Sequence, residues 1–249
     1  MRPTKLAICV LTVVLLISSL FGSAVSLAAF ADLDGVWAEE AILSLDKQGL
    51  FEDLWVEEFS PSHSLTHEDA FQLLSAAFEL TEDEKVALQD WLNQLLVAHP
   101  EGITRGEFAA VLANLLGLGE HTEAPQGFYP SFSDLNMDYP GFLGIEVLQR
   151  LALLPAHMVG RFEPYRLITR AEVAYILEQA LRLTELDGVV AEVENDGRQI
   201  VLSTEEDEEG VILNLLAETL YLAPDSLTKA DISTGQKLNT GEHVVVLTR

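Results

Sequence analysis

The chain repeats an ordered set of landmarks, and this repeat constrains its fold more than any other feature. Residues 30–80 and residues 132–183 both run Phe-x-Asp, an amphipathic stretch, Phe-x-Pro, and then Thr with an acidic residue three positions later. The opening Phe and the Thr are 36 residues apart in the first copy and 37 in the second, and the proline and the Thr are 5 apart in both. Agreement at several landmarks indicates a repeated structural unit.

A third unit lies between these two copies. Residues 81–118 keep the second half of the pattern, with Thr104 and Glu107 again three positions apart, but they lack both Phe-x-Asp and Phe-x-Pro. Because one helix pair cannot bury its own apolar face, the three units should pack against one another. Apolar residues at helical spacing predict helices near residues 37–50, 71–78, 81–96, 104–116, 142–151 and 173–181.

After about residue 184 the pattern changes from helical spacing to alternation. A turn at 195–197 between two alternating stretches is typical of a β-hairpin. Five or so short strands in residues 184–249 imply a small, partly closed β-barrel. The predicted fold class is therefore α+β in separate domains, with an all-α repeat domain at 29–183 followed by a small β-barrel domain. Strands are expected within 186–194, 199–203, 211–216, 219–222 and 241–247.

The helical landmarks resemble the S-layer homology family, whose repeats open with Phe-x-Asp and carry Trp-Ala, Phe-x-Pro and Thr-Arg-Ala-Glu. The resemblance covers about residues 30–183, in units at 29–80, 81–118 and 130–183, with the middle unit shortened. It implies a pseudo-threefold arrangement that attaches a secreted protein, without catalysis, to a cell-wall polysaccharide. That polymer often carries ketal-linked pyruvate on an amino sugar, and it is held in grooves between units.

The N-terminal residues are typical of a secretory signal peptide. Arg2 and Lys5 precede an apolar run from Leu6 to Leu20, and small residues follow as far as Ala28, so we expect cleavage after residue 28. The alternative is an uncleaved membrane anchor, which the short apolar run disfavours. The single cysteine lies inside this segment, so the mature chain would have neither a disulfide nor a thiol nucleophile. The expected location is the cell wall or cell surface.

The charge of the mature chain excludes several partners. It would carry 12 basic and 40 acidic side chains, a formal net charge of −28. Such a field repels nucleic acid and anionic membranes, so an anionic ligand must be captured locally by placed arginines. We expect no cofactor, because no motif for one occurs. We expect no metal site either, because the histidines lack ligand spacing and the calcium-like run at 134–138 lacks the glycine and glutamate that such a loop needs.

The Thr-Arg-x-Glu motif has two parts with different explanations. Thr169 with Glu172, and Thr104 with Glu107, fit helix capping boxes, as does the threonine at position 81. Capping does not explain Arg170 or Arg105, since the helix dipole disfavours a cation at this end. An arginine beside free helix N–H groups suits bidentate binding of a carboxylate, such as that of a pyruvyl ketal. Salt bridging to nearby acids is the alternative.

Other candidate ligand-binding residues are mapped by the resemblance. Asp32 and Asp134 occupy the opening acidic position, where turn formation is an equal alternative. Trp37 and Tyr139 could stack on a sugar ring, although Trp37 is also a candidate core residue. His67 stands where the first unit should have its arginine, which predicts a weak groove or one that is active when His67 is protonated.

The predicted function is therefore non-catalytic attachment to an anionic wall polysaccharide or a peptidoglycan-linked glycan. The β-domain could contact another surface protein. The alternative is a surface protein–protein adaptor, or an S-layer-associated structural protein, that has lost glycan binding. A wall hydrolase is not expected, because no pair of carboxylates sits on a recognisable active-site framework.

Overall fold

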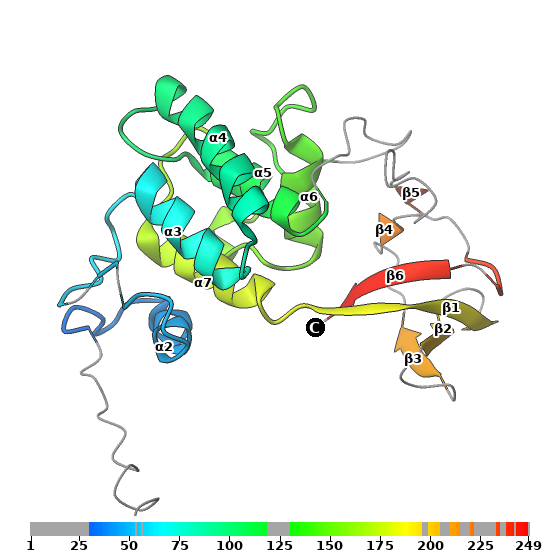
Figure 1. Ribbon diagram of the computed structural model, residues 1–249. Coiled ribbons are helices and arrows are strands. Elements are labelled where there is room, and N and C mark those ends of the chain that lie inside the picture. Colours follow the sequence, from blue (N-terminus) through cyan, green and yellow to red (C-terminus); the bar gives the residue numbers. More distant parts are fainter. Residues whose placement is uncertain are drawn as a thin grey trace, which may run out of the picture.

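The computed structural model describes residues 30–52, 54–55, 57–118, 130–195, 199–204, 210–214, 220–221, 233–234, 238–241 and 243–248 (Figure 1). The predicted signal peptide at 1–28 lies outside these ranges. Within them, no helix combines the length and the apolar character needed to cross a membrane. The described chain is a mixture of helices and antiparallel sheet, with the helices first and the strands after residue 183.

The helical elements of the described residues are α2 (Glu39–Lys47), α3 (His67–Ala77), α4 (Glu82–Ala98), α5 (Arg105–Leu115), α6 (Phe142–Arg150), the short 3-10 helix η1 (Ala156–Met158) and α7 (Arg170–Ala180). All six α-helices lie where apolar periodicity predicts them. The predicted capping boxes at Thr81, Thr104 and Thr169 are confirmed, each with its glutamate bonded back to the threonine backbone. Thr66 caps α3 through the backbone N–H of Asp69.

The helices pack in a cyclic order. Helix α3 of the first unit packs against α4 of the second, α5 of the second against α6 of the third, and α7 of the third against α2 of the first. The second helix of each unit therefore contacts the first helix of the next, and the last contact returns to the beginning of the helical part. Figure 1 shows α2 to α7 gathered into one assembly.

A ring of backbone hydrogen bonds joins the segments that lead into α3, α5 and α7. The N–H of Leu65 donates to the carbonyl of Ile168 at 3.0 Å, and the N–H of Ile168 donates to the carbonyl of Ile103 at 3.0 Å. The N–H of Ile103 closes the ring by donating to Leu65 at 3.2 Å. Each of these residues directly precedes the threonine of its unit. The same position in each unit therefore contacts its counterpart in the next.

One apolar core runs through all three helical units. Its fully buried side chains come from every helix of the described part and include Ile42, Leu74, Leu92, Phe108 and Ile176. Phe51 and Phe59 add an aromatic cluster under the first unit, with ring centroids 5.2 Å apart. Because this core needs apolar faces from all three units, the site-forming loops are positioned by the assembly rather than by one unit.

The strands form a separate structure with its own small core. A four-stranded antiparallel sheet has the order β3 (Val211–Asn214), β2 (Gln199–Thr204), β1 (Thr184–Glu194) and β6 (His243–Thr248), and β4 (Leu220–Tyr221) pairs with β5 (Ser233–Thr234). Val190, Ile200, Leu202 and Val244 form a buried cluster that is distinct from the helical core. Figure 1 shows this sheet beside the helices, reached directly from α7.

The predicted strands are confirmed in outline. In the described residues β3 and β6 are the two edges of the sheet, so closure into a barrel stays a prediction. The register shifts between Val190 and Glu192, where a bulge bends β1 against β2. The helix or turn expected near residues 224–232 falls outside the described residues.

Candidate functional site

The two predicted aspartates fasten the loops that precede α3 and α7. The carboxylate of Asp32 accepts the N–H of Phe59 at 2.9 Å and that of Ser60 at 2.7 Å. Asp134 accepts the two equivalent N–H groups at the start of 162–164, both at 2.8 Å. Both oxygens of each side chain are thus used inside one unit. The turn-forming interpretation therefore describes these aspartates better than direct ligand contact.

The first backbone N–H groups of α5 and α7 are already bonded. At the start of α5, the first two N–H groups donate to the carbonyls of Arg166 at 2.7 Å and Pro164 at 2.9 Å. At the start of α7, the equivalent groups donate to His63 at 2.9 Å and Pro61 at 3.0 Å. The expectation of free helix N–H groups beside the arginines is wrong, because the loop of the next unit supplies acceptors for them.

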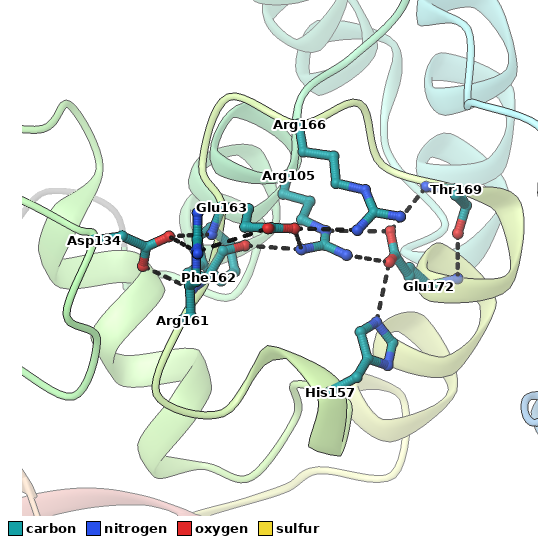
Figure 2. Close-up of polar contacts among 9 residues, drawn as sticks. All are labelled: Arg105, Asp134, His157, Arg161, Phe162, Glu163, Arg166, Thr169 and Glu172. Carbon is teal, nitrogen blue, oxygen red and sulfur yellow. Dashed lines mark hydrogen bonds and ion pairs between the residues drawn. The ribbon is translucent and has the colours of Figure 1, made fainter.

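Arg105 lies inside the protein and joins the second and third units. Its side chain is 2% exposed, and it donates to the carbonyl of Phe162 at 3.0 Å and to Glu163 Oε2 at 3.1 Å. Its other nitrogens reach both carboxylate oxygens of Glu172, the shorter contact being 2.5 Å (Figure 2). Burial alone would raise the pKa of Glu172, but hydrogen bonds from Arg105 and from the Thr169 backbone outweigh it and lower that pKa. Arg105 therefore has no surface for a ligand in this arrangement.

Arg170 occupies the matching position between the third and first units. It donates to the carbonyl of Phe59 at 3.0 Å and lies 3.7 Å from Asp69 Oδ2. Its guanidinium carbon is 4.4 Å from the ring centroid of Trp55, a cation–π contact. The side chain is 17% exposed. Both motif arginines thus follow the salt-bridge alternative, although they are more buried than surface pairs would be.

His67 completes the series between the first and second units. Its side chain is buried, and its Nε2 has no hydrogen-bond partner among the described residues. Burial lowers the pKa of His67, the charge of Glu107 opposes this, and His99 adds to it. His99 lies 3.5 Å from Glu107 and 3.8 Å from Glu101. The acid opposite each of these three side chains is therefore the acidic residue three positions after the motif threonine of the next unit: Glu172 for Arg105, Asp69 for Arg170 and Glu107 for His67.

An open groove of about 520 Å³ lies at the start of α7, and we call it the α7 groove. The first unit contributes residues near its Phe-x-Asp and Phe-x-Pro segments, and the third unit contributes the helix start and the loop before it. The lining residues are Gly35, Val36, Trp37, Pro61, Ser62, His157, Arg166, Thr169, Ala171 and Glu172. Of the predicted site residues, it brings together Trp37 and Thr169.

Trp37 is a surface residue of this groove and not part of the core. It is 52% exposed, so the alternative that placed it in the core is wrong. Its ring lies edge-on to His157 at 5.0 Å and 5.4 Å from the ring of Tyr175. These contacts orient the indole while leaving much of it accessible. An exposed, oriented indole is a suitable surface for the apolar face of a sugar ring.

The basic side chains of the α7 groove are the imidazole of His157 and the guanidinium of Arg166, which were not among the predicted site residues. His157 is partly exposed, and its Nε2 lies 3.0 Å from Glu172 Oε1, the oxygen that Arg105 also contacts (Figure 2). Arg166 is 56% exposed and bonds Glu163 at 3.1 Å. A sequence signal existed for Arg166, because it stands three positions before the motif threonine in a chain with few cations. No comparable signal marks His157.

Tyr139 occupies the matching place at the start of α5, which we call the α5 site. Its phenol oxygen lies against Gly106 and interacts with the Thr104 side chain, and its ring is 5.5 Å from that of Tyr165. The predicted site residues Thr104 and Tyr139 are thus together, away from the α7 groove. No group of three acidic, histidine or cysteine side chains suited to a metal ion occurs in the part of the chain that the structure describes.

Comparison with known proteins gives no assignment for this arrangement. No protein-family model matches the chain, and no curated protein matches it.

Proposed function

We propose that this protein attaches, without catalysis, to an anionic cell-wall polysaccharide through the α7 groove. The single observation that carries the proposal is the exposed Trp37 beside the exposed Arg166 and the partly exposed His157. The indole would stack on a sugar ring. Arg166 and His157 would receive a carboxylate, which in a pyruvyl ketal projects from the ring edge.

The proposed architecture is three S-layer-homology-like units in a pseudo-threefold arrangement, followed by a small β-barrel. The cyclic packing of the helices and the ring of bonds among Leu65, Ile103 and Ile168 support the threefold part. The repeated roles of Asp32 and Asp134 support equivalent loops in the first and third units. With this arrangement the glycan would lie between units, as the resemblance implies, and the protein would be exported to the cell surface.

The local chemistry of the α7 groove suits an anion despite the charge of the whole chain. The sequence has a formal net charge of −26, so long-range attraction of an anionic polymer is not available. Glu172 is the acid that lines the groove, and its carboxylate is neutralised by Arg105 from inside the protein. Arg166 and His157 can therefore face a ligand without an unpaired carboxylate beside them.

The test is sedimentation with purified cell-wall sacculi of the organism that encodes the chain. The wild-type protein should sediment, and Trp37→Ala and Arg166→Ala should each weaken binding about tenfold, which corresponds to about 1.4 kcal/mol. Tyr165→Ala and Arg161→Ala are matched controls, because both remove exposed side chains outside the α7 groove. If Trp37→Ala sediments like the wild type, the groove does not bind the wall.

A protein–protein adaptor remains the second candidate, and one observation favours it. Tyr165, Met137 and Val159 are large apolar side chains exposed on the third unit, and residues of these types are common in protein interfaces. Sacculi digested with protease discriminate the two functions. Glycan attachment should survive the digestion, and a free pyruvyl-ketal amino sugar should compete with it. An adaptor should lose its binding to digested sacculi and should ignore the sugar.

A further inference from the structure

The α5 site and the α7 groove are built from matching positions of successive units. Each lies where the start of a second helix meets the Phe-x-Pro loop of the next unit, and both loops accept two N–H groups from the helix. In each matching pair the residue of the α7 groove is named first and its counterpart in the α5 site second. They are Trp37 with Tyr139, Ala171 with Gly106, Ser62 with Tyr165, and Arg166 with Glu101.

The two places differ in what fills them. A Cβ added to Gly106 would lie 2.0 Å from the phenol oxygen of Tyr139 and 2.6 Å from the ring carbon that bears it. Tyr139 can therefore rest on the start of α5 only because position 106 is glycine. In the α7 groove the matching residue is Ala171, and Trp37 stands clear of the helix with half of its surface exposed. Tyr139 therefore packs against α5 at the α5 site, whereas Trp37 is exposed in the α7 groove.

The charge of the α5 site is also opposite to that of the α7 groove. Glu101 stands where the α7 groove has Arg166, and it lies 3.8 Å from His99. Burial and the nearby charge of Glu107 raise the pKa of Tyr139 to about 12, so the phenol stays neutral. A carboxylate-bearing sugar would meet an acidic rim here, and it would have to displace the partly buried ring of Tyr139.

We infer that Tyr139, seated on Gly106, closes the α5 site, so that of these two matching places only the α7 groove takes a saccharide. This inference rests on the proposed function for its ligand, but not for the closure itself. Closure makes attachment monovalent. A chain with two open grooves could bind neighbouring units of one polymer, and the second contact would be intramolecular and would slow release. With a single groove, the protein can dissociate from one site on the polymer and bind at another.

The closure can be tested without any ligand, by chemical nitration of tyrosines followed by peptide mass mapping. Tyr165 is 73% exposed and serves as the reactive reference in the same chain. In the wild type, Tyr139 should react much more slowly than Tyr165. In Gly106→Ala it should react at a similar rate, because the added methyl group expels the ring. Alanine also favours helix over glycine, so α5 is not weakened.

Ala171→Gly is the matched control for the labelling experiment. It makes the corresponding change at the start of α7 and should leave the reactivity of Tyr139 unchanged. Tyr139 reacting as fast as Tyr165 in the wild type would overturn the closure. This outcome does not depend on whether the protein binds any sugar, so the closure and the proposed function can fail separately.

The restriction to one groove is tested by calorimetric titration with a pyruvyl-ketal amino-sugar glycoside. The wild type should bind one equivalent. The triple variant Gly106→Ala, Tyr139→Trp and Glu101→Arg gives the α5 site three of the four matching residues of the α7 groove and should bind two. A wild type that binds two equivalents, or a folded triple variant that still binds one, contradicts the inference. A wild type that binds none contradicts the proposed function and leaves the labelling result standing.

Discussion

Equivalent residues form the junction between α5 and α7 and the junction between α7 and α3. The two junctions differ in how deeply their arginines are buried. Arg105 and Arg170 occupy the same motif position, and each donates to the carbonyl of the Phe-x-Pro phenylalanine in the next unit, at 3.0 Å in both cases. Arg105 is 2% exposed and binds a glutamate with two nitrogens, whereas Arg170 is 17% exposed and has an aspartate 3.7 Å away. The motif therefore determines where the acid opposite the arginine lies. The length of that acid's side chain determines how closely its carboxylate approaches the guanidinium.

The second junction is held in a different way. Asp69 is one methylene shorter than Glu172, and neither its Oδ2 nor Arg170 Nε has a hydrogen-bond partner in the described residues. The flat face of Trp55 supports the guanidinium of Arg170 instead. A buried ion pair with full hydrogen bonding and a partly exposed cation–π contact respond differently to the loss of one member.

The largest effect is expected for Arg105→Ala. It leaves Glu172 buried without its main partner, so the free energy of unfolding should fall by about 3–5 kcal/mol. Urea denaturation followed by circular dichroism measures this. Adding Glu172→Gln should recover part of the loss, because the uncompensated charge is removed. Arg161→Ala, at an exposed arginine, is the control and should change stability by less than about 0.5 kcal/mol.

Arg170→Ala should have a smaller effect, about 1–2 kcal/mol in the same measurement. It removes one charge-assisted hydrogen bond and one cation–π contact, and water can reach the partly buried Asp69 once the guanidinium is gone. Arg170→Lys should retain little of the stability, since an ammonium group cannot stack as a planar guanidinium does. Equal losses for Arg170→Ala and Arg105→Ala would show that the two junctions do not differ.

Lengthening the acid should bring the looser junction closer to the tighter one. Asp69→Glu places a carboxylate within reach of Arg170 and also supplies the glutamate that completes a capping box with Thr66. We expect a gain of about 0.5–1 kcal/mol in the free energy of unfolding. Glu68→Asp, next to it on the exposed side of α3, tests whether acid length alone matters. A loss of stability in Asp69→Glu would refute the explanation from length.

The smallest expected effect is on the pH dependence of the free energy of unfolding. It arises at the junction between the first and second units, where His67 lies. Because burial lowers the pKa of His67 in the folded protein, the unfolded chain binds this proton more readily. The contribution of His67 to the free energy of unfolding is therefore highest at neutral pH and falls as the pH drops below about 6.5, the ordinary pKa of a histidine side chain. Glu107, Glu101 and His99 face the same place and moderate the effect.

His67→Gln isolates this contribution. Urea midpoints between about pH 5 and pH 8 should vary less with pH in the variant than in the wild type. Identical slopes in the two proteins would mean that His67 does not set the acid sensitivity of this junction.

Local features of the fold were predictable from the sequence, because their causes are local. The capping boxes at Thr104 and Thr169 depend on residues three positions apart, and apolar spacing located every described α-helix. The partner of Arg105 was not predictable, because Glu172 is 67 residues away and was already explained by its role in the cap. One carboxylate serves both purposes, which no pattern of spacing reveals.

The site was only partly predictable for a related reason. Trp37 and Tyr139 are equivalent in sequence, yet one is exposed and the other rests on α5, and the difference originates in Gly106 of another unit. Reading each unit alone therefore cannot decide which aromatic residue faces outward. Arg166 and His157 were missed because they lie outside the motif and reach the α7 groove only when the first and third units meet.

The ring formed by Leu65, Ile103 and Ile168 has a consequence for synthesis of the chain. During translation the first unit emerges with both of its neighbouring units absent, and its segment at Leu65 can bond to Ile168 only after more than a hundred further residues have been made. The helical part should therefore stay incomplete until its last unit is released. The export that the proposed function requires would then meet a chain that remains open, and able to pass through a translocation channel, for most of its synthesis.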